Sequence, residues 1–192
     1  MWVPADLPRL LRATRALLTE RLAEPDSPQN LLLKSVTPLA AIRAIADFLR
    51  SSITGDPIVG LILGTGSFAL QVGTWLGLSI ALPALARQFH TQITERQAFV
   101  LSTYAMTPLW LAGFLHLVPE EPNFLFFWSR SLVAVVGASG LVIAHRGILA
   151  LGVRRSMRMP LLGAIAGAAA VLYATLFVLL GIGAHIVIFL VG

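Results

Sequence analysis

The stretch "STYAMTPLWLAGFLHLVPEE", residues 102–121, places a proline in the middle of an apolar run that ends at two glutamates. In a soluble helix Pro108 would act as a break, because proline lacks an N–H and its ring clashes with the preceding turn. A membrane-spanning helix tolerates such a residue, since neighbouring helices and Ser/Thr hydroxyls satisfy the freed backbone groups. The stretch therefore predicts a kinked membrane span, if the rest of the chain is equally apolar.

The overall composition meets that condition. Hydrophobic residues make up 57% and charged residues 12% of the 192-residue chain, whereas soluble domains are about 45–50% apolar and about 25% charged. The mean hydropathy is +0.83. The net charge of +5 fits basic loops that face an anionic membrane surface, so nucleic acid is not expected as a partner. The composition predicts an integral membrane protein in contact with the lipid bilayer.

Hydropathy along the chain predicts five spans, each with about 20 or more mostly apolar residues. They are residues 27–52, 58–86, 98–118, 124–151 and 160–191. The first is the least apolar, because it carries Lys34, Arg43 and Asp47. It is counted as a span because Ser27 followed by Pro28 is a favourable N-cap and first-turn pair. The predicted fold class is an all-α, polytopic membrane protein with five transmembrane helices.

Loop charges predict the orientation of these spans. With the N-terminus inside, the outer loops hold Arg50 and the acidic pair Glu120 and Glu121. The inner segments then hold Arg9, Arg12, Arg15, Arg21, Arg87, Arg96, Arg154, Arg155 and Arg158. This positive-inside pattern predicts a cytoplasmic N-terminus and a C-terminus outside. The preference for arginine over lysine is typical of a GC-rich bacterial genome, so the inner (cytoplasmic) membrane is the expected location.

Residues 1–27 are predicted to form a cytosolic segment in front of a membrane domain over 28–192. Leucines recur at helical spacing through residues 5–24, while arginines lie on the other faces, which predicts an N-terminal amphipathic interfacial helix. Two arrangements are open for this helix. It lies on the cytoplasmic leaflet, or it packs against the inner loops of its own protein.

The sequence contains no pattern typical of an enzyme. HExxH, GxSxG and GxxxxGK[ST] are absent, and there is no cysteine for thiolate chemistry. His90, His116, His145 and His185 are spread one per segment, without the close spacing of metal ligands. We expect interfacial or hydrogen-bonded histidines, and neither an enzyme, a cofactor nor a metal site.

Arg43 and Asp47 are the most unusual residues of the predicted first span, because they lie four residues apart on one helical face. An ionisable residue at that depth is a candidate for an ion or proton path. The alternative is a structural ion pair, in which Asp47 partners Arg43 or Arg130. The structural pair is favoured, since a single acidic residue makes a poor proton relay.

Glycines and Thr-Pro pairs predict how the spans pack. The patterns "GLILG" (60–64), "GTWLG" (73–77) and "GAIAG" (163–167) mark close helix–helix contacts, within one subunit or in a homodimer; their glycines are Gly60, Gly64, Gly73, Gly77, Gly163 and Gly167. "SVTPLAAI" (35–42) and "YAMTPLWLA" (104–112) both place Thr-Pro-Leu inside a span. In each, the threonine hydroxyl is expected to bond a backbone carbonyl where proline disrupts the helix, so both helices are predicted to bend.

The chain resembles a known family through "EPDSPQNLLLKSVTPLAAIRAI" (24–45) and "ERQAFVLSTYAMTPLWLAGFLHLVP" (95–119). Tyr104, Thr107 and Pro108 match the Tyr-x-x-Thr-Pro stretch in the third span of the Yip family, the Ypt- or Rab-GTPase-interacting membrane proteins, and the resemblance is to its bacterial branch. It implies a cytosolic N-terminus, five membrane helices and an outside C-terminus. Eukaryotic relatives bind prenylated Rab-type GTPases and shape membranes, but residues 1–27 are much shorter than their cytosolic domains.

The predicted function is a non-enzymatic scaffold or adaptor that binds another membrane protein, or itself as a homo-oligomer, or that organises lipid. Tyr104, Thr107 and Pro108, together with Arg43 and Asp47, are the candidate binding residues. Two alternatives remain open. One is a small oligomeric transporter or channel that uses Arg43 and Asp47, and the other is an accessory subunit of a larger membrane complex.

Overall fold

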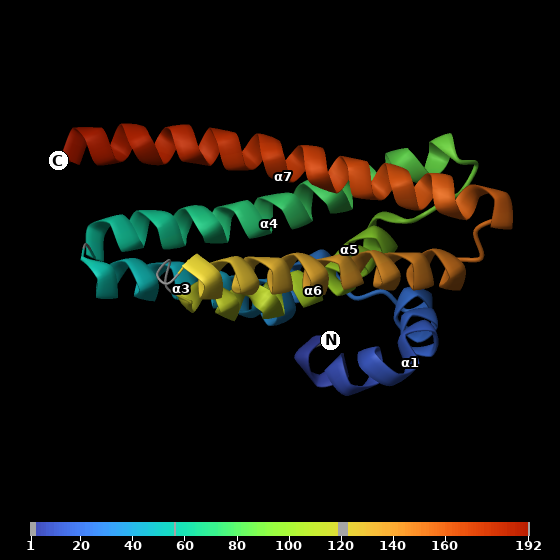
Figure 1. Cartoon of the computed structure of the whole chain (residues 1–192). Helices are drawn as coiled ribbons and strands as arrows, with labels where there is room; N and C mark the ends of the chain where they lie inside the picture. Colours follow the sequence, from blue (N-terminus) through green and yellow to red (C-terminus); the bar gives the residue numbers. More distant parts are fainter. Residues whose placement is uncertain (1–2, 56, 119–122, 192) are drawn as a thin grey trace.

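The computed structural model describes residues 3–55, 57–118 and 123–191, and within these ranges it is built of helices (Figure 1). Pro119, Glu120 and Glu121, on which the predicted outer loop depends, lie outside the described residues. The helices are α1 (Val3–Ala23), α2 (Pro28–Leu31), the π-helix η1 (Leu32–Val36), α3 (Thr37–Thr54), α4 (Pro57–Gln88), α5 (Glu95–Leu111), the 3₁₀-helix η2 (Ala112–Leu117), α6 (Asn123–Ala150) and α7 (Arg155–Val191).

Local sequence signals explain where two of these helices begin. The Ser27 side chain accepts a hydrogen bond from the Asn30 backbone N–H, and Pro28 occupies the first turn of α2, so the predicted cap is confirmed. At the start of α5, Thr94 and Gln97 form a reciprocal capping box. Both caps satisfy amide groups that the first turn of a helix leaves without intrahelical partners.

The long helices run side by side in alternating directions, with the C-terminus of α7 at the same end as the α3–α4 turn (Figure 1). Among the described residues, four helical segments are long and apolar enough to cross a membrane: Pro57–Gln88, Glu95–Leu117, Phe124–Ala150 and Arg155–Gly183. The α3 helix packs along α4 but is not among these four. The described residues therefore form a helical bundle with four candidate spans, while the fifth span stays a prediction.

Helical geometry changes next to both Thr-Pro pairs. Before Pro38, residues Leu32–Val36 form a π-helix, in which the Thr37 N–H bonds the Leu32 carbonyl. After Pro108, the chain tightens into the 3₁₀-helix η2. Short π and 3₁₀ segments within longer helices often mark bends or functional sites. Each proline thus lies beside a departure from regular α geometry.

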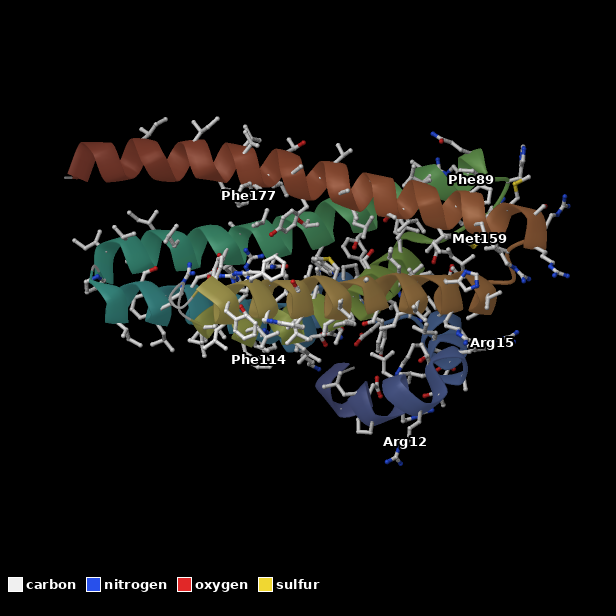
Figure 2. All side chains as sticks on the ribbon, in the orientation of Figure 1. Arg12, Arg15, Phe89, Phe114, Met159 and Phe177 are labelled. Carbon is white, nitrogen blue, oxygen red and sulfur yellow. The ribbon has the colours of Figure 1, made fainter. Side chains whose placement is uncertain are left out.

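The N-terminal helix α1 is broken into two arms at Ala13, whose backbone is non-helical (φ −140°, ψ 46°). The arms face each other, because Arg9 pairs with Glu20 at 2.7 Å across the break. Leu17 and Leu18 are fully buried and belong to the main hydrophobic core, against α5 and α6. Arg12 and Arg15 point away from the bundle (Figure 2). The leucine face of α1 therefore packs against α5 and α6 of its own protein, and the location of α1 at the membrane interface stays a prediction.

Candidate functional site

Arg43 and Asp47 face each other on α3, with 3.5 Å between Arg43 Nε and Asp47 Oδ2. Both side chains are largely enclosed, at 14% and 7% exposure. Their spacing of four residues places them on one face of the helix, as predicted. The pair lies at the centre of a larger group of polar side chains, which we call the polar network: Arg43, Asp47, Ser67, His116 and Tyr173.

Asp47 receives contacts from three helices. Ser67 on α4 donates its hydroxyl to Asp47 Oδ2, and His116 Nδ1 on η2 lies 3.1 Å from Asp47 Oδ1. When Asp47 is ionised its carboxylate only accepts hydrogen bonds, and the His116 ring nitrogen is then the donor. A buried carboxylate with several donors keeps its charge at a much lower cost than an isolated one. The carboxylate thereby connects α3, α4 and η2.

Arg43 connects the same network to α7. Its Nη1 donates to the Tyr173 hydroxyl at 2.8 Å. Its Nε is buried and has no hydrogen-bond acceptor within the described part of the chain, since the 3.5 Å approach to Asp47 is an ion pair rather than a directed bond. Gly113 makes room for the arginine, because a Cβ at that position would lie 2.8 Å from the Arg43 Cβ.

Tyr104 lies in a second, separate cluster at the junction of α5 with α1. The tyrosine is fully buried, and its hydroxyl donates to Asp6 Oδ2. Arg21 donates to the same carboxylate through Nε at 3.1 Å and Nη2 at 2.9 Å. Burial raises the pKa of Asp6, but the hydrogen bonds from Arg21 and Tyr104 outweigh burial and leave this pKa below its usual value. We call Asp6, Arg21 and Tyr104 the α1 clamp.

Thr107 and Pro108 lie on α5, one turn beyond Tyr104. The Thr107 hydroxyl donates to the Thr103 carbonyl at 2.8 Å, which satisfies a backbone oxygen in the turn before Pro108. Neither residue contacts the polar network through a hydrogen bond that the structure describes. Their connection to it is through the backbone, because η2 follows α5 and carries His116.

The predicted packing glycines fall into three different surroundings. Gly60 and Gly64 lie directly against α3, where a Cβ would meet backbone carbonyls of Phe48 and Ala44 at 2.9 Å and 2.8 Å. Gly73 and Gly77 lie against leucine side chains of α7. Around Gly163 and Gly167 a Cβ would meet nothing within 4 Å, so this face of α7 is open. Gly140, in the glycine cluster "GASG" (137–140), lies against α5, where a Cβ would collide with the Ala105 carbonyl.

The polar network can exchange a proton between His116 and Asp47, and it presents a guanidinium within an apolar bundle. Across residues 3–55, 57–118 and 123–191, no three His, Asp or Glu side chains gather as a set of metal ligands.

Ser67, His116 and Tyr173 were not expected in this site, because they come from distant parts of the chain. A buried arginine and aspartate need further polar partners, and that need is the one signal that could have prompted a search for them.

A sequence profile of the Yip1 domain matches residues 10–182, which is most of the chain. The match agrees with the family that the Tyr-x-x-Thr-Pro stretch of α5 predicted. No curated protein and no solved structure matches the chain. Together with the four long apolar helices, the profile match indicates a multi-pass membrane protein.

Proposed function

The chain belongs to the Yip1 domain family, and we propose that it is a non-enzymatic scaffold or adaptor that binds another membrane protein or organises lipid. In this proposal α3 is a fifth span, the N-terminus is cytoplasmic and the C-terminus is outside. The proposal assigns the polar network and the α1 clamp to the architecture of the bundle. The binding surface is then a separate feature of the molecule.

The observation that carries this proposal is the open face of α7. In the apolar stretch of α7 that could span a membrane, 6% of the residues are buried inside the protein. The corresponding stretch of α5 and η2 has 61% of its residues buried. Its Gly163 and Gly167 leave room for another backbone to approach closely. In lipid, helices associate through such close packing at small residues. A long apolar helix with an uncovered glycine face is what a membrane adaptor needs for a partner helix.

Cross-linking through single cysteines tests this surface, because the chain contains no cysteine of its own. In native membranes, Gly167→Cys should cross-link to a defined partner or to a second copy, and Gly163→Leu should reduce that product at least several-fold by blocking close approach. Val135→Cys, on an exposed position of α6, is the matched control and should give no specific product. Equal products from Gly167→Cys and Val135→Cys would contradict the proposal.

The contact between His116 and Asp47 favours a second candidate, a small oligomeric transporter or channel. The sequence alone shows one acidic group, whereas the structure pairs it with a second protonatable side chain. This candidate predicts that Asp47→Asn abolishes a proton flux in proteoliposomes. A scaffold, or an accessory subunit of a larger complex, has no such flux to lose.

A further inference from the structure

A cavity of about 110 Å³ opens between α3, α4 and α7. One cationic side chain, Arg43, and one hydroxyl, Ser67, lie in its wall. The rest of the lining is apolar or glycine: Ile62, Leu63, Gly66, Leu70, Phe177, Leu180 and Gly181. Phe177 is 58% exposed, and Figure 2 shows it on α7. The cavity thus joins a cation inside the bundle to an exposed apolar surface.

Arg43 has hydrogen-bonding capacity that its protein partners do not use. A guanidinium carries five N–H donors, and the described contacts of Arg43 are one hydrogen bond to the neutral Tyr173 hydroxyl and the 3.5 Å ion pair with Asp47. Its buried Nε has no acceptor in the described part of the chain. Leaving such a donor unsatisfied is unfavourable.

Asp47 does not supply the missing acceptor, because its Oδ2 lies 3.5 Å from Arg43 Nε and accepts no hydrogen bond from it. Ser67 donates to Oδ2 and His116 to Oδ1, so the carboxylate is shared among three groups. The usual arginine–carboxylate pair is bidentate and parallel, and this one is not. A second carboxylate that enters the cavity would find free donors on Arg43.

We propose that this cavity binds the carboxylate head group of a long-chain amphiphile, such as a fatty acid, with Arg43 holding the carboxylate. The apolar wall of α4 and α7, continued by the exposed Phe177, would hold the chain. This wall favours an amphiphile over a free anion, because a free anion gains nothing from apolar contacts. The single guanidinium favours a singly charged carboxylate, since it provides one planar fork of donors. The proposal goes beyond the scaffold function, which requires no bound ligand.

The test uses palmitate labelled with ¹³C at its carboxyl carbon, added to the full chain in lipid nanodiscs. We expect a carboxyl resonance that is separate from that of palmitate in the bilayer. A tenfold excess of hexadecanol, which lacks the charge, should leave this resonance in place, and so should acetate, which lacks the chain. Displacement by hexadecanol would show a purely apolar groove, displacement by acetate a simple anion site, and either would overturn the proposal.

Two variants separate the cavity from the rest of the protein. Arg43→Gln should remove the resonance. Gly66→Leu should also remove it by filling the cavity while keeping Arg43, and it should fold, because a Cβ at Gly66 meets nothing within 4 Å. Gly183→Leu is the matched control, at an equally open position of α7 that does not line the cavity, and should bind palmitate as the parent does. A resonance that survives Gly66→Leu, or that never appears, would refute the site, whatever the cross-linking at Gly167 shows.

Discussion

At the scale of single residues, Asp6 shows how a polar side chain fixes an amphipathic helix. The leucine face of α1 would bury itself against any apolar surface, because hydrophobic burial has no preferred direction. Asp6 is 5% exposed and accepts hydrogen bonds from Arg21 and Tyr104. The bonds from Arg21 join the two arms of α1, and the bond from Tyr104 of α5, which has strict geometry, selects one position for α1 on the bundle.

The α1 clamp makes the position of α1 depend on pH. The hydrogen bonds lower the pKa of Asp6 from its ordinary value of 3.8, so their stabilisation is complete above pH 3.8 and is lost as the pH falls through the folded-state pKa. A spin label on Arg12→Cys, an exposed site of α1, should show constant mobility from pH 7 to pH 5 and rising mobility in stronger acid. Tyr104→Phe removes one donor, which should weaken docking by about 1.5–3 kcal/mol and move the transition to higher pH.

Tyr173→Phe is the control for that experiment, because its hydroxyl belongs to the polar network and not to the clamp. This variant should leave the transition unchanged. An identical transition in Tyr104→Phe and the parent protein would show that the tyrosine hydroxyl does not hold α1.

The polar residues also show what sequence reasoning reaches at this scale. The pairing of Arg43 with Asp47 was predictable, because helical periodicity fixes the relation of residues four apart. The contacts of Asp47 with Ser67 and His116 join positions that are 20 and 69 residues away. No local rule relates such positions, since their distance depends on how three helices cross. The same holds for Tyr104 and Asp6, which are 98 residues apart.

At the scale of elements, the 3₁₀-helix η2, which follows the Thr-Pro pair of α5, sets where His116 points. The six residues of η2 follow Pro108 by one turn. A 3₁₀-helix advances 120° per residue and an α-helix 100°. Over the five residues from Leu111 to His116, the difference is roughly 100° of rotation. An α-helix continued through this segment would therefore turn His116 away from Asp47.

Pro108→Ala restores an N–H that can bond the Tyr104 carbonyl and removes the ring from the turn before it. If the distorted turn imposes the 3₁₀ geometry that follows, regular α geometry should continue beyond Leu111. The six-residue segment would then shorten by about 3 Å, because the rise per residue falls from about 2.0 Å to about 1.5 Å. Spin labels at the exposed Phe48 and Phe114 should report this as a changed distance between α3 and η2. Membrane insertion should remain intact, and any assembly that depends on the shape of α5 should change.

Pro160→Ala provides the comparison, since Pro160 is exposed near the start of α7 and follows no such change in helix type. It should leave the distance between the labels on Phe48 and Phe114 unaltered. If Pro108→Ala also leaves it unaltered, packing against the bundle rather than proline dictates the 3₁₀ geometry.

At the scale of the whole molecule, composition and periodicity were sufficient to predict a helical membrane bundle, but the number of spans rests on α3. This helix carries Arg43, Asp47 and Arg50 within 18 residues, so it is less apolar than the other four. Arg43 and Asp47 are largely enclosed, at 14% and 7% exposure, and their opposite charges are paired within the polar network. A hydropathy scale assigns each charged residue the full cost of placing its charge in a membrane. It does so because the sequence contains no information on which charged side chains are paired with partners in the folded protein.

The topology proposed for α3 can be tested with single cysteines and a membrane-impermeant thiol reagent. Residues 28–54 form one helical run through α2, η1 and α3, about 40 Å long at 1.5 Å per residue, which exceeds the roughly 30 Å of hydrocarbon in a bilayer. We expect Ile53→Cys to react from outside in intact cells, while Glu24→Cys and Gln92→Cys react only after permeabilisation. If α3 does not cross, Glu24 and Ile53 lie on one side and Gln92 on the other. That result would leave four spans, place both termini on the same side, and require α3 to lie along the bundle from a single face of the membrane.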